Sequence, residues 1–490
     1  MQNYSNIIPS FLTKFSPDPN KPFFSWFLWV GVLILAFFWP IPNGLLPFHR
    51  NFLLLPVFFI LFYDVFSDKK LREEVARPIK GKLWPVGLLS LWLLIVGLFF
   101  SGKGVGYMEL YNGKWLRVIE TGFMGIAILP VVLAYQKKLD AVDIFWGIIC
   151  AMWLVPLVQM LDIIWLGFKS HSIPWQETRI AYSRMELSVH VNLVLSFFAT
   201  ELTLRAALGK SWLSVKTPVL VFMFAVCVFV DLQLVTRNAT VGMISMVVSN
   251  VIFVMLYRFR KWGTKKLILV ALAGIVFLGA LVKISLVTDP RWRSLAETVP
   301  YSLDIKNYKF WLNNEKYPHP RLASGEEVSL SNYERLAWAK VGIELVAKEP
   351  LGIGIGNDNF HRLVEKHFQE PSTTTQSHSG LLNFTFAAGI PGLLLWLMLI
   401  FSFAATGWNS FYREKKVVGL FLLMFILGFT SRSVFDDVLR DHMLEMFTFF
   451  SCLLLVICYR EKSQAVECSD GGPSAMNPPV DSWGKHKKSF

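Results

Sequence analysis

The sequence predicts an all-α membrane protein: a bundle of about twelve transmembrane helices with one large polar loop that contains helices of its own. The chain has 490 residues, of which 54% are hydrophobic and only 17% are charged, with a mean hydropathy of +0.46. Soluble domains are about a quarter charged, and a soluble protein this apolar would expose large adhesive patches. The apolar residues also form long continuous runs, which favours helices over the alternating strands of a membrane barrel.

Each apolar run is close to the length that crosses a bilayer core, which takes about 20 residues in a helix. The runs lie near 24–40, 48–66, 83–100, 116–135, 142–167, 186–207, 216–236, 239–257, 266–287, 379–406, 417–431 and 442–459.

The basic residues indicate how these helices are oriented. The net charge is +13, and most Lys and Arg of the short loops fall in alternate connections, for example 69–82, 258–266 and 413–416. Because basic loops stay in the cytoplasm, we expect both termini to be cytoplasmic and the loop at 288–377 to lie outside. The positive charge then reflects topology, and we expect no nucleic-acid partner.

The chain divides into four parts on this interpretation. Residues 1–287 hold the first nine helices, 288–377 form the outer loop domain, 378–460 hold the last three helices, and 461–490 form a disordered cytoplasmic tail rich in Ser, Gly, Pro and charge. The N-terminus has no cleavable signal pattern, so the first span is expected to be retained.

Cysteine and carboxylate patterns predict no metal or other cofactor. Four of the five cysteines lie in apolar runs, the fifth is Cys468, and no CxxC or Cys/His spacing is present. Asp436 and Asp437 are adjacent rather than spaced, and Arg432 and Arg440 flank them, which indicates ion pairs instead of a site for a hard cation.

The outer loop contains a helix-like segment at 331–350 and a second at about 358–369. Ser331 is a plausible N-cap, with Glu334 three residues later in the capping-box pattern. The helix is expected to end at Pro350 and Gly352. Its apolar positions are expected to face the membrane domain, namely Leu336, Ala339, Ile343 and Val346.

Three side chains are candidates for chemistry on the outer side. Arg237 stands between two apolar runs with almost no loop, where it either binds an anion or reaches the interface. Arg335, in the loop helix, suits a diphosphate because guanidinium binds two oxygens at once; alternatively it is a solvated partner of Glu334. His378, where the loop re-enters the membrane, could move a proton near neutrality or could only cap or pack locally.

A glycine-rich stretch follows the loop helix at 352–360. Backbone N–H groups there could hold a phosphate at the start of the next helix. The stretch does not follow a strand, so it is a poor dinucleotide motif, and we favour a tight turn after Pro350.

Taken together, these residues resemble the O-antigen ligase and polymerase family, most specifically over 331–393. The resemblance includes Arg237 after the seventh span and the Arg–x–x–Trp pair Arg335 and Trp338. It continues with the P-x-G-x-G-x-G-x-x-x-F stretch from Pro350 to Phe360, then His378 and the GIPGL break at 389–393. Arg184, before the sixth span, matches more loosely. The chain departs from the pattern in two places. Thr236-Arg237-Asn238 stands where many relatives have Ser-Arg-Gly, and His378-Ser379 stands where many have His-Asn. The second difference resembles the ligases more than the polymerases.

The resemblance implies a glycosyltransferase of the Gram-negative inner membrane with a periplasmic active site. It implies a donor glycan on undecaprenyl diphosphate, lipid A–core oligosaccharide as the acceptor, and inversion at the anomeric carbon without a metal. Arg237, Arg335 and Arg184 would bind the diphosphate, and His378 would be the catalytic residue, activating the acceptor hydroxyl or orienting the donor. The lipid tails would enter sideways between helices from the surrounding membrane lipids.

Other functions remain open from the sequence. Within the family these are a polymerase that joins repeat units and a protein O-oligosaccharyltransferase. From another class comes a transporter of lipid-linked sugars, which would place charges near the bilayer midplane and interrupt helices in paired repeats. The charges here lie instead at the outer edge. A membrane scaffold would leave the outer Arg and His residues unexplained.

Overall fold

The computed structural model describes residues 22–41, 49–100, 114–136, 138–181, 183–258, 263–288, 294–322, 325–356 and 358–470. Its regular structure over these residues is helical apart from one isolated bridge between Arg321 and Glu327. The helices before the loop domain are α2 (Pro22–Phe38), α3 (His49–Ser67), α4 (Lys69–Pro78), the π-helix η2 (Ile79–Leu83), α5 (Trp84–Phe99), α7 (Lys114–Tyr135), α8 (Ala141–Ser170), α9 (Arg184–Leu208), α10 (Thr217–Gln233), α11 (Arg237–Arg258) and α12 (Thr264–Thr288). The loop domain and the C-terminal part contain α13 (Leu295–Leu303), α14 (Leu330–Lys348), α15 (Asn359–Phe368), α16 (Gly380–Tyr412), α17 (Val418–Phe435) and α18 (Asp441–Asp470).

The helical membrane fold is confirmed. Within the described residues, nine helical stretches are long and apolar enough to cross a membrane, and three shorter apolar helices lie in α2, α3 and α10. Every predicted apolar run falls on one of these helices. We predict that the three shorter helices also cross the membrane, which would give about twelve spans.

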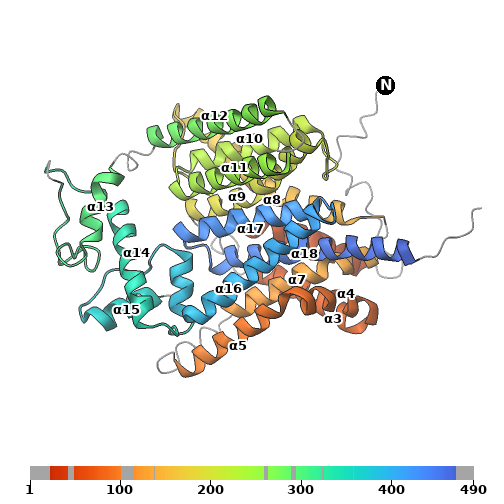
Figure 1. The fold of residues 1–490 in the computed structure, drawn as a ribbon, viewed down its shortest axis with the longest axis horizontal. Coiled ribbons are helices and arrows are strands. Elements are labelled where there is room, and N and C mark those ends of the chain that lie inside the picture. The colour runs from red at the N-terminus through yellow and green to blue at the C-terminus, as the bar shows by residue number, and fades with distance from the viewer. Residues whose placement is uncertain are drawn as a thin grey trace, which may run out of the picture.

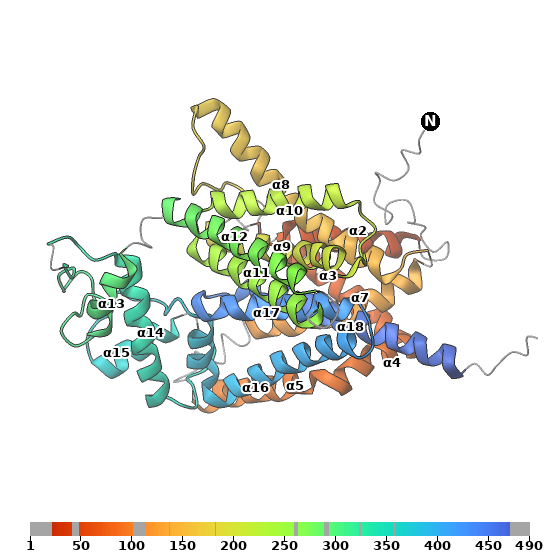
Figure 2. The same ribbon diagram turned by 45° about the horizontal axis from the view of Figure 1, so that its top comes forward.

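The apolar helices lie side by side, and the loop-domain helices gather at one end of the bundle. Figures 1 and 2 show α13, α14 and α15 at the end opposite to the C-terminal end of α18. Inside the bundle α18 packs on α7, and α16 packs on both α17 and α5. The loop domain has a hydrophobic cluster of its own, which includes Trp311, Tyr333 and Phe360, and Phe386 of α16 belongs to it. The loop domain is therefore docked on α16.

Local capping residues set several helix ends. Asp140 accepts from the backbone N–H of Asp143 in a capping box that opens α8, and Ser183 caps α9. Gly209 ends α9 in the left-handed conformation. Ser379 caps α16 by accepting from the N–H of Leu382.

The glycine-rich stretch at 352–360 packs against the GIPGL break at 389–393. Helix α16 is interrupted at Gly389, which has φ 67°, and it bends near α14 (Figure 1). The amide groups of Ile353 and Gly354 donate to carbonyls of Phe386 and Ala387 at 2.9 and 3.0 Å, and Ile390 N–H donates to Pro350 C=O at 2.8 Å. The predicted tight turn after Pro350 is present, and its amide groups satisfy the carbonyls that the helix break exposes.

Two expectations for the loop helix were wrong. The N-cap of α14 is Ser329, not Ser331, because the helix already begins at Leu330. The buried stripe is Tyr333, Ala337, Val341 and Leu345, whereas Ile343 is exposed. The chosen apolar positions follow helical spacing, but the large ring of Tyr333 is fully buried in the hydrophobic cluster of the loop domain, and the stripe that contains it packs inward instead.

The second loop helix was correctly predicted, as α15. The predicted tail begins within α18, which continues to Asp470, and its remainder at 471–490 lies outside the described residues.

Candidate active site

Arg237 and Arg335 are held by each other's helices. Arg237 is the first residue of α11, and its guanidinium donates to Asn332 Oδ1 and, at 2.6 Å, to Ser331 Oγ, both at the start of α14. In the other direction Arg335 Nη1 donates to Asn238 Oδ1 at 3.0 Å. Two candidates that lie far apart in the sequence are therefore brought to the contact between α11 and α14.

His378, just before α16, is linked to the helix of Arg335 through a ring contact with Trp338. Trp338 is one turn after Arg335 on α14, and its indole ring stacks on the imidazole of His378 with centroids 5.2 Å apart. His378 has φ 55°, a left-handed backbone conformation that is uncommon for a residue with a side chain. Burial, and after it the charge of Arg335, lowers the pKa of His378 to about 4. The imidazole is therefore neutral at pH 7 and able to accept a proton.

The connection between α17 and α18 closes the site beside His378. Gly380 N–H donates to Asp436 C=O at 2.9 Å, so this connection touches the start of α16. The charges of Asp436 and Arg440 act on His378 in opposite directions, the first raising its pKa and the second lowering it. Arg440 forms an ion pair with Asp437 at 3.1 Å, and burial raises the pKa of Asp437.

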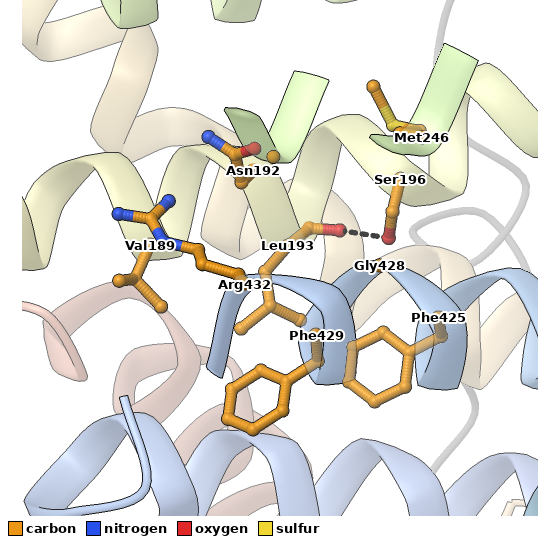
Figure 3. A pocket seen from close by; sticks show the side chains of 10 residues that line it. Val189, Asn192, Leu193, Ser196, Met246, Phe425, Gly428, Phe429 and Arg432 are labelled. Atoms are coloured by element: carbon orange, nitrogen blue, oxygen red, sulfur yellow. Dashed lines mark hydrogen bonds between the residues drawn. The ribbon is translucent and has the colours of Figure 1, made fainter. Parts of the chain in front are cut away.

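Arg432 forms a further ion pair in this region, and this pair is buried. Its guanidinium binds Asp436 at 2.9 Å and donates to the backbone carbonyl and hydroxyl of Ser188 on α9. The ion-paired interpretation of Arg432, Asp436, Asp437 and Arg440 is thus confirmed. Arg432 also lines a cavity of about 30 Å³ between α9, α11 and α17, where Asn192 and Met246 come from the facing helices (Figure 3). The cavity is large enough to hold a water molecule.

Arg184 occupies a different position. It is the first residue of α9, and its guanidinium donates to the side chain of Gln176, whose backbone N–H donates to Gln233 C=O at the end of α10. Through Gln176, Arg184 is thus linked to the end of α10, next to the connection between α10 and α11. A role for Arg184 in the same site as Arg237 stays a prediction.

The arrangement provides concentrated positive charge beside a neutral base. Guanidinium groups bind phosphate oxygens in pairs, and fixed positive charge stabilises a leaving diphosphate without rearrangement. Among the described side chains, no group of three His, Cys, Asp or Glu lies close enough together to hold a metal ion.

Sequence reasoning did not identify Asn332 as part of this site, and it noted Asn238 only as a departure from a pattern. Asn332 precedes Arg335 by three residues on α14 and therefore shares its helix face. The three-residue spacing from Arg335 could have indicated that Asn332 belongs to the site, but an asparagine near a helix start ordinarily indicates a cap.

The comparison with known families gives a match to part of the chain. Residues 219–397, which run from α10 into α16, match the model of the family described as O-antigen ligase. The chain carries the O-antigen ligase domain. The matched segment contains Arg237, Arg335 and His378, whereas Arg184 and Arg432 lie outside it. No curated protein sequence matches the chain.

The O-antigen ligase domain is shared by ligases and polymerases of polyprenyl-linked glycans. The chain is accordingly a multi-span membrane protein with a domain of this bacterial family over residues 219–397, and the family implies lipid-linked glycan substrates.

Proposed function

We propose that the protein is an O-antigen ligase of the Gram-negative inner membrane. It transfers a glycan from undecaprenyl diphosphate to lipid A–core oligosaccharide at the periplasmic face and so completes lipopolysaccharide. The reaction inverts the anomeric carbon and needs no metal, because arginines supply the positive charge.

The observation that carries the proposal is the arginine pair at the contact between α11 and α14, with His378 stacked on Trp338, which is one helical turn after Arg335. A sugar diphosphate presents two anionic groups beside an electrophilic carbon. The site presents two guanidinium groups, which can bind the two phosphates, beside a neutral imidazole, which can accept a proton near the electrophilic carbon.

The transfer step follows from these roles. A hydroxyl oxygen of the acceptor attacks the anomeric carbon, and the bond from that carbon to the diphosphate oxygen breaks with its electron pair. His378 accepts the hydroxyl proton, and undecaprenyl diphosphate leaves with the added negative charge. Arg237 and Arg335 stabilise that charge, which is larger on the departing diphosphate than on the bound donor.

The membrane orientation is part of the proposal. The loop-domain helices lie at one end of the bundle (Figure 1), and α14 among them carries Arg335. The basic connections, such as 69–82 in α4 and η2, are expected to face the cytoplasm. The site end is then periplasmic, where acceptor and donor glycans meet.

The choice of ligase over polymerase rests on His378-Ser379, which is closer to the ligases than the His-Asn pair. Ser379 caps α16 through its hydroxyl, so the residue after the histidine begins the helix that carries Gly389.

The test uses purified protein in detergent, without divalent metal, supplied with undecaprenyl-diphosphate glycan and lipid A–core. Wild type is compared with His378→Ala and Arg335→Ala. Arg321→Ala is the matched control, because Arg321 lies in the same loop domain with its side chain 68% exposed. Glycan should appear on lipid A–core with wild type and Arg321→Ala, and should be lost in the two site variants.

Other outcomes would redirect the assignment. Growth of the glycan on its own lipid carrier would make the protein a polymerase. Transfer to neither acceptor would direct the test to pilin-like protein acceptors and to transport of the lipid-linked sugar. Full transfer by both site variants would reject this site.

A further inference from the structure

A larger cavity lies in the second half of α11, about 15 Å along that helix from Arg237. Its volume is about 320 Å³, and α9, α10, α11 and α12 line it. These four helices lie together on one side of the bundle (Figures 1 and 2). Helix α9 packs on both α10 and α11, and its small side chains Ala199, Thr203 and Ala206 leave the space between those two helices unfilled. Ala206 is exposed, so the cavity is a groove that opens at the surface of the bundle.

The lining of the groove suits a hydrocarbon chain. Phe224, Val251 and Phe277 line it from α10, α11 and α12. Asn250 is a polar residue of the lining, and its amide nitrogen donates to the carbonyl of Met246 in the same helix at 2.9 Å. The volume falls within the range of ligand pockets, roughly 300–1,000 Å³. The groove therefore fits an apolar ligand better than a sugar or a phosphate group.

Basic side chains surround the end of the groove where α9 ends and α12 begins. Lys265 and Lys266 are exposed in the first turn of α12, and Val270, one turn later, lines the groove. The chain contains two Lys in 209–216 and five Lys and Arg in 258–266, with no Asp or Glu in either segment. An apolar groove thus ends beside concentrated positive charge, which is the order of features that an anionic lipid presents in reverse.

The groove also borders the helix that leads into the loop domain. Helix α12 packs chiefly on α11, and only 11% of its most apolar part is buried inside the protein. A chain in the groove would contact α9, α10 and α12 at once. It would therefore hold α12 against the bundle by burying apolar surface that α11 alone does not cover.

We propose that this groove binds one acyl chain of an anionic glycerophospholipid, with the lipid phosphate beside Lys265 and Lys266. Charge complementarity selects an anionic lipid over a zwitterionic one. The lysines lie at the end of the groove away from Arg237, which selects a phospholipid over the tail of a glycan carrier whose diphosphate is bound at Arg237. The inference concerns a different part of the molecule and does not depend on glycan transfer.

The experiment measures which lipid stays bound to the full-length protein. Protein is reconstituted in vesicles of phosphatidylglycerol, phosphatidylethanolamine and undecaprenyl phosphate in equal parts, extracted in detergent and weighed by native mass spectrometry. The double variant Lys265→Gln with Lys266→Gln removes the headgroup contact. Ala206→Phe fills the groove, and Thr203→Phe, one turn earlier in α9, fills it independently if Ala206→Phe does not fold.

Each change has a matched control outside the groove. Lys69→Gln with Lys70→Gln removes another exposed pair of adjacent lysines at a helix start, in α4, which packs on α3 and α7. Leu272→Phe adds a ring to α12 at a residue that is 52% exposed and does not line the groove.

Wild type and both controls should retain phosphatidylglycerol over phosphatidylethanolamine by at least about tenfold, because each Lys near an anionic group contributes about fivefold in affinity. The double lysine variant should lose most of this preference, and the groove-filling variants should retain neither phospholipid. Added phosphatidylglycerol should raise the melting temperature of wild type and the controls but not that of the groove-filling variants.

Four outcomes would overturn the proposal. Equal retention of the two phospholipids by wild type would show that no anionic lipid is selected. Undiminished phosphatidylglycerol on Ala206→Phe and Thr203→Phe would place the lipid outside the groove. Undecaprenyl phosphate that is retained by wild type and lost from these variants would make the groove a site for the glycan carrier. A dimer that is lost in the same way would make it a contact with a second copy of the chain.

Discussion

The indole ring of Trp338 lies 5.2 Å from the imidazole of His378 between ring centroids, and the two planes are tilted by only 26°. Trp338 also donates from Nε1 to the carbonyl of Trp311 at 3.0 Å, which ties the same ring to the loop-domain core. The orientation of the proposed catalytic histidine therefore depends on how the loop domain docks on the membrane helices.

Trp338→Leu should slow glycan transfer by about two- to tenfold, because an aromatic stack contributes about 0.5–1.5 kcal/mol beyond its buried area. Trp338→Phe keeps a ring against His378 and should retain more activity, losing only the bond to Trp311. Initial rates in the reconstituted assay provide the measurement. Trp408→Leu is the control, because Trp408 stacks on Tyr412 toward the opposite end of α16. Equal effects from Trp338→Leu and Trp408→Leu would argue against a role for the His378 stack.

The pKa of His378 should lie near 4, because burial and the charge of Arg335 both disfavour the imidazolium. Titration of the imidazole by NMR on histidine-labelled protein can measure it. In Arg335→Gln the loss of positive charge should raise this pKa, and His378→Ala identifies the signal. A pKa at the ordinary value near 6.5 in wild type would contradict the buried position.

The same lowered pKa predicts acid sensitivity. Between pH 6.5 and about 4 the unfolded chain binds a proton at His378 that the folded protein does not, so folding stability falls as pH decreases through this window. The contribution is up to about 3 kcal/mol. Melting temperatures of His378→Gln should depend less on pH in this window than those of wild type, whereas above pH 6.5 the two curves should run parallel.

The contact between the glycine-rich stretch and the break in α16 should tolerate no side chain. A Cβ on Gly389 would lie 2.3 Å from the backbone of Leu351, and one on Gly352 would lie 2.4 Å from the backbone of Gly389. Both glycines also have positive φ. Gly389→Ala and Gly352→Ala should each destabilise the docked loop domain by more than about 2 kcal/mol, since overpacking adds to strain, and should expose the loop to protease.

Gly325→Ala separates the two causes. Gly325 has φ 87°, but nothing lies within 4 Å of its Cβ position. Its substitution should therefore cost only the conformational strain, about 1 kcal/mol. If Gly325→Ala and Gly389→Ala destabilise equally, backbone conformation rather than close contact would explain the motif.

The buried pair of Arg432 and Asp436 should be more sensitive to single than to double substitution. Arg432→Met leaves the Asp436 carboxylate buried without this partner, which costs about 3–5 kcal/mol, whereas replacing both members by apolar residues is often close to neutral. Thermal unfolding of Arg432→Met, Asp436→Leu and the double variant provides the test. A double variant as unstable as the sum of the singles would show that the two side chains do not act as a pair.

The sequence by itself determined the helices and their order. Long apolar runs have to form helices in lipid because every backbone polar group needs a partner there, and each run falls on a helix of the structure. It also indicated Arg237 and His378, because charged and titratable groups beside apolar spans are costly and therefore informative. Arg335 was indicated by the suitability of guanidinium for a diphosphate and by its Arg–x–x–Trp spacing from Trp338.

Only the tertiary structure decided which partners hold these groups. Two hydrogen bonds cross between the helices, from Arg237 to Asn332 and from Arg335 to Asn238. Each joins residues more than 90 positions apart, and no local pattern encodes such a pairing. The inward face of α14 was decided in the same way. Several faces of that helix carry apolar residues, and packing against Trp311 and Phe360 selects the stripe with Tyr333 and Val341. Side-chain shape at a contact, rather than periodicity, makes that selection.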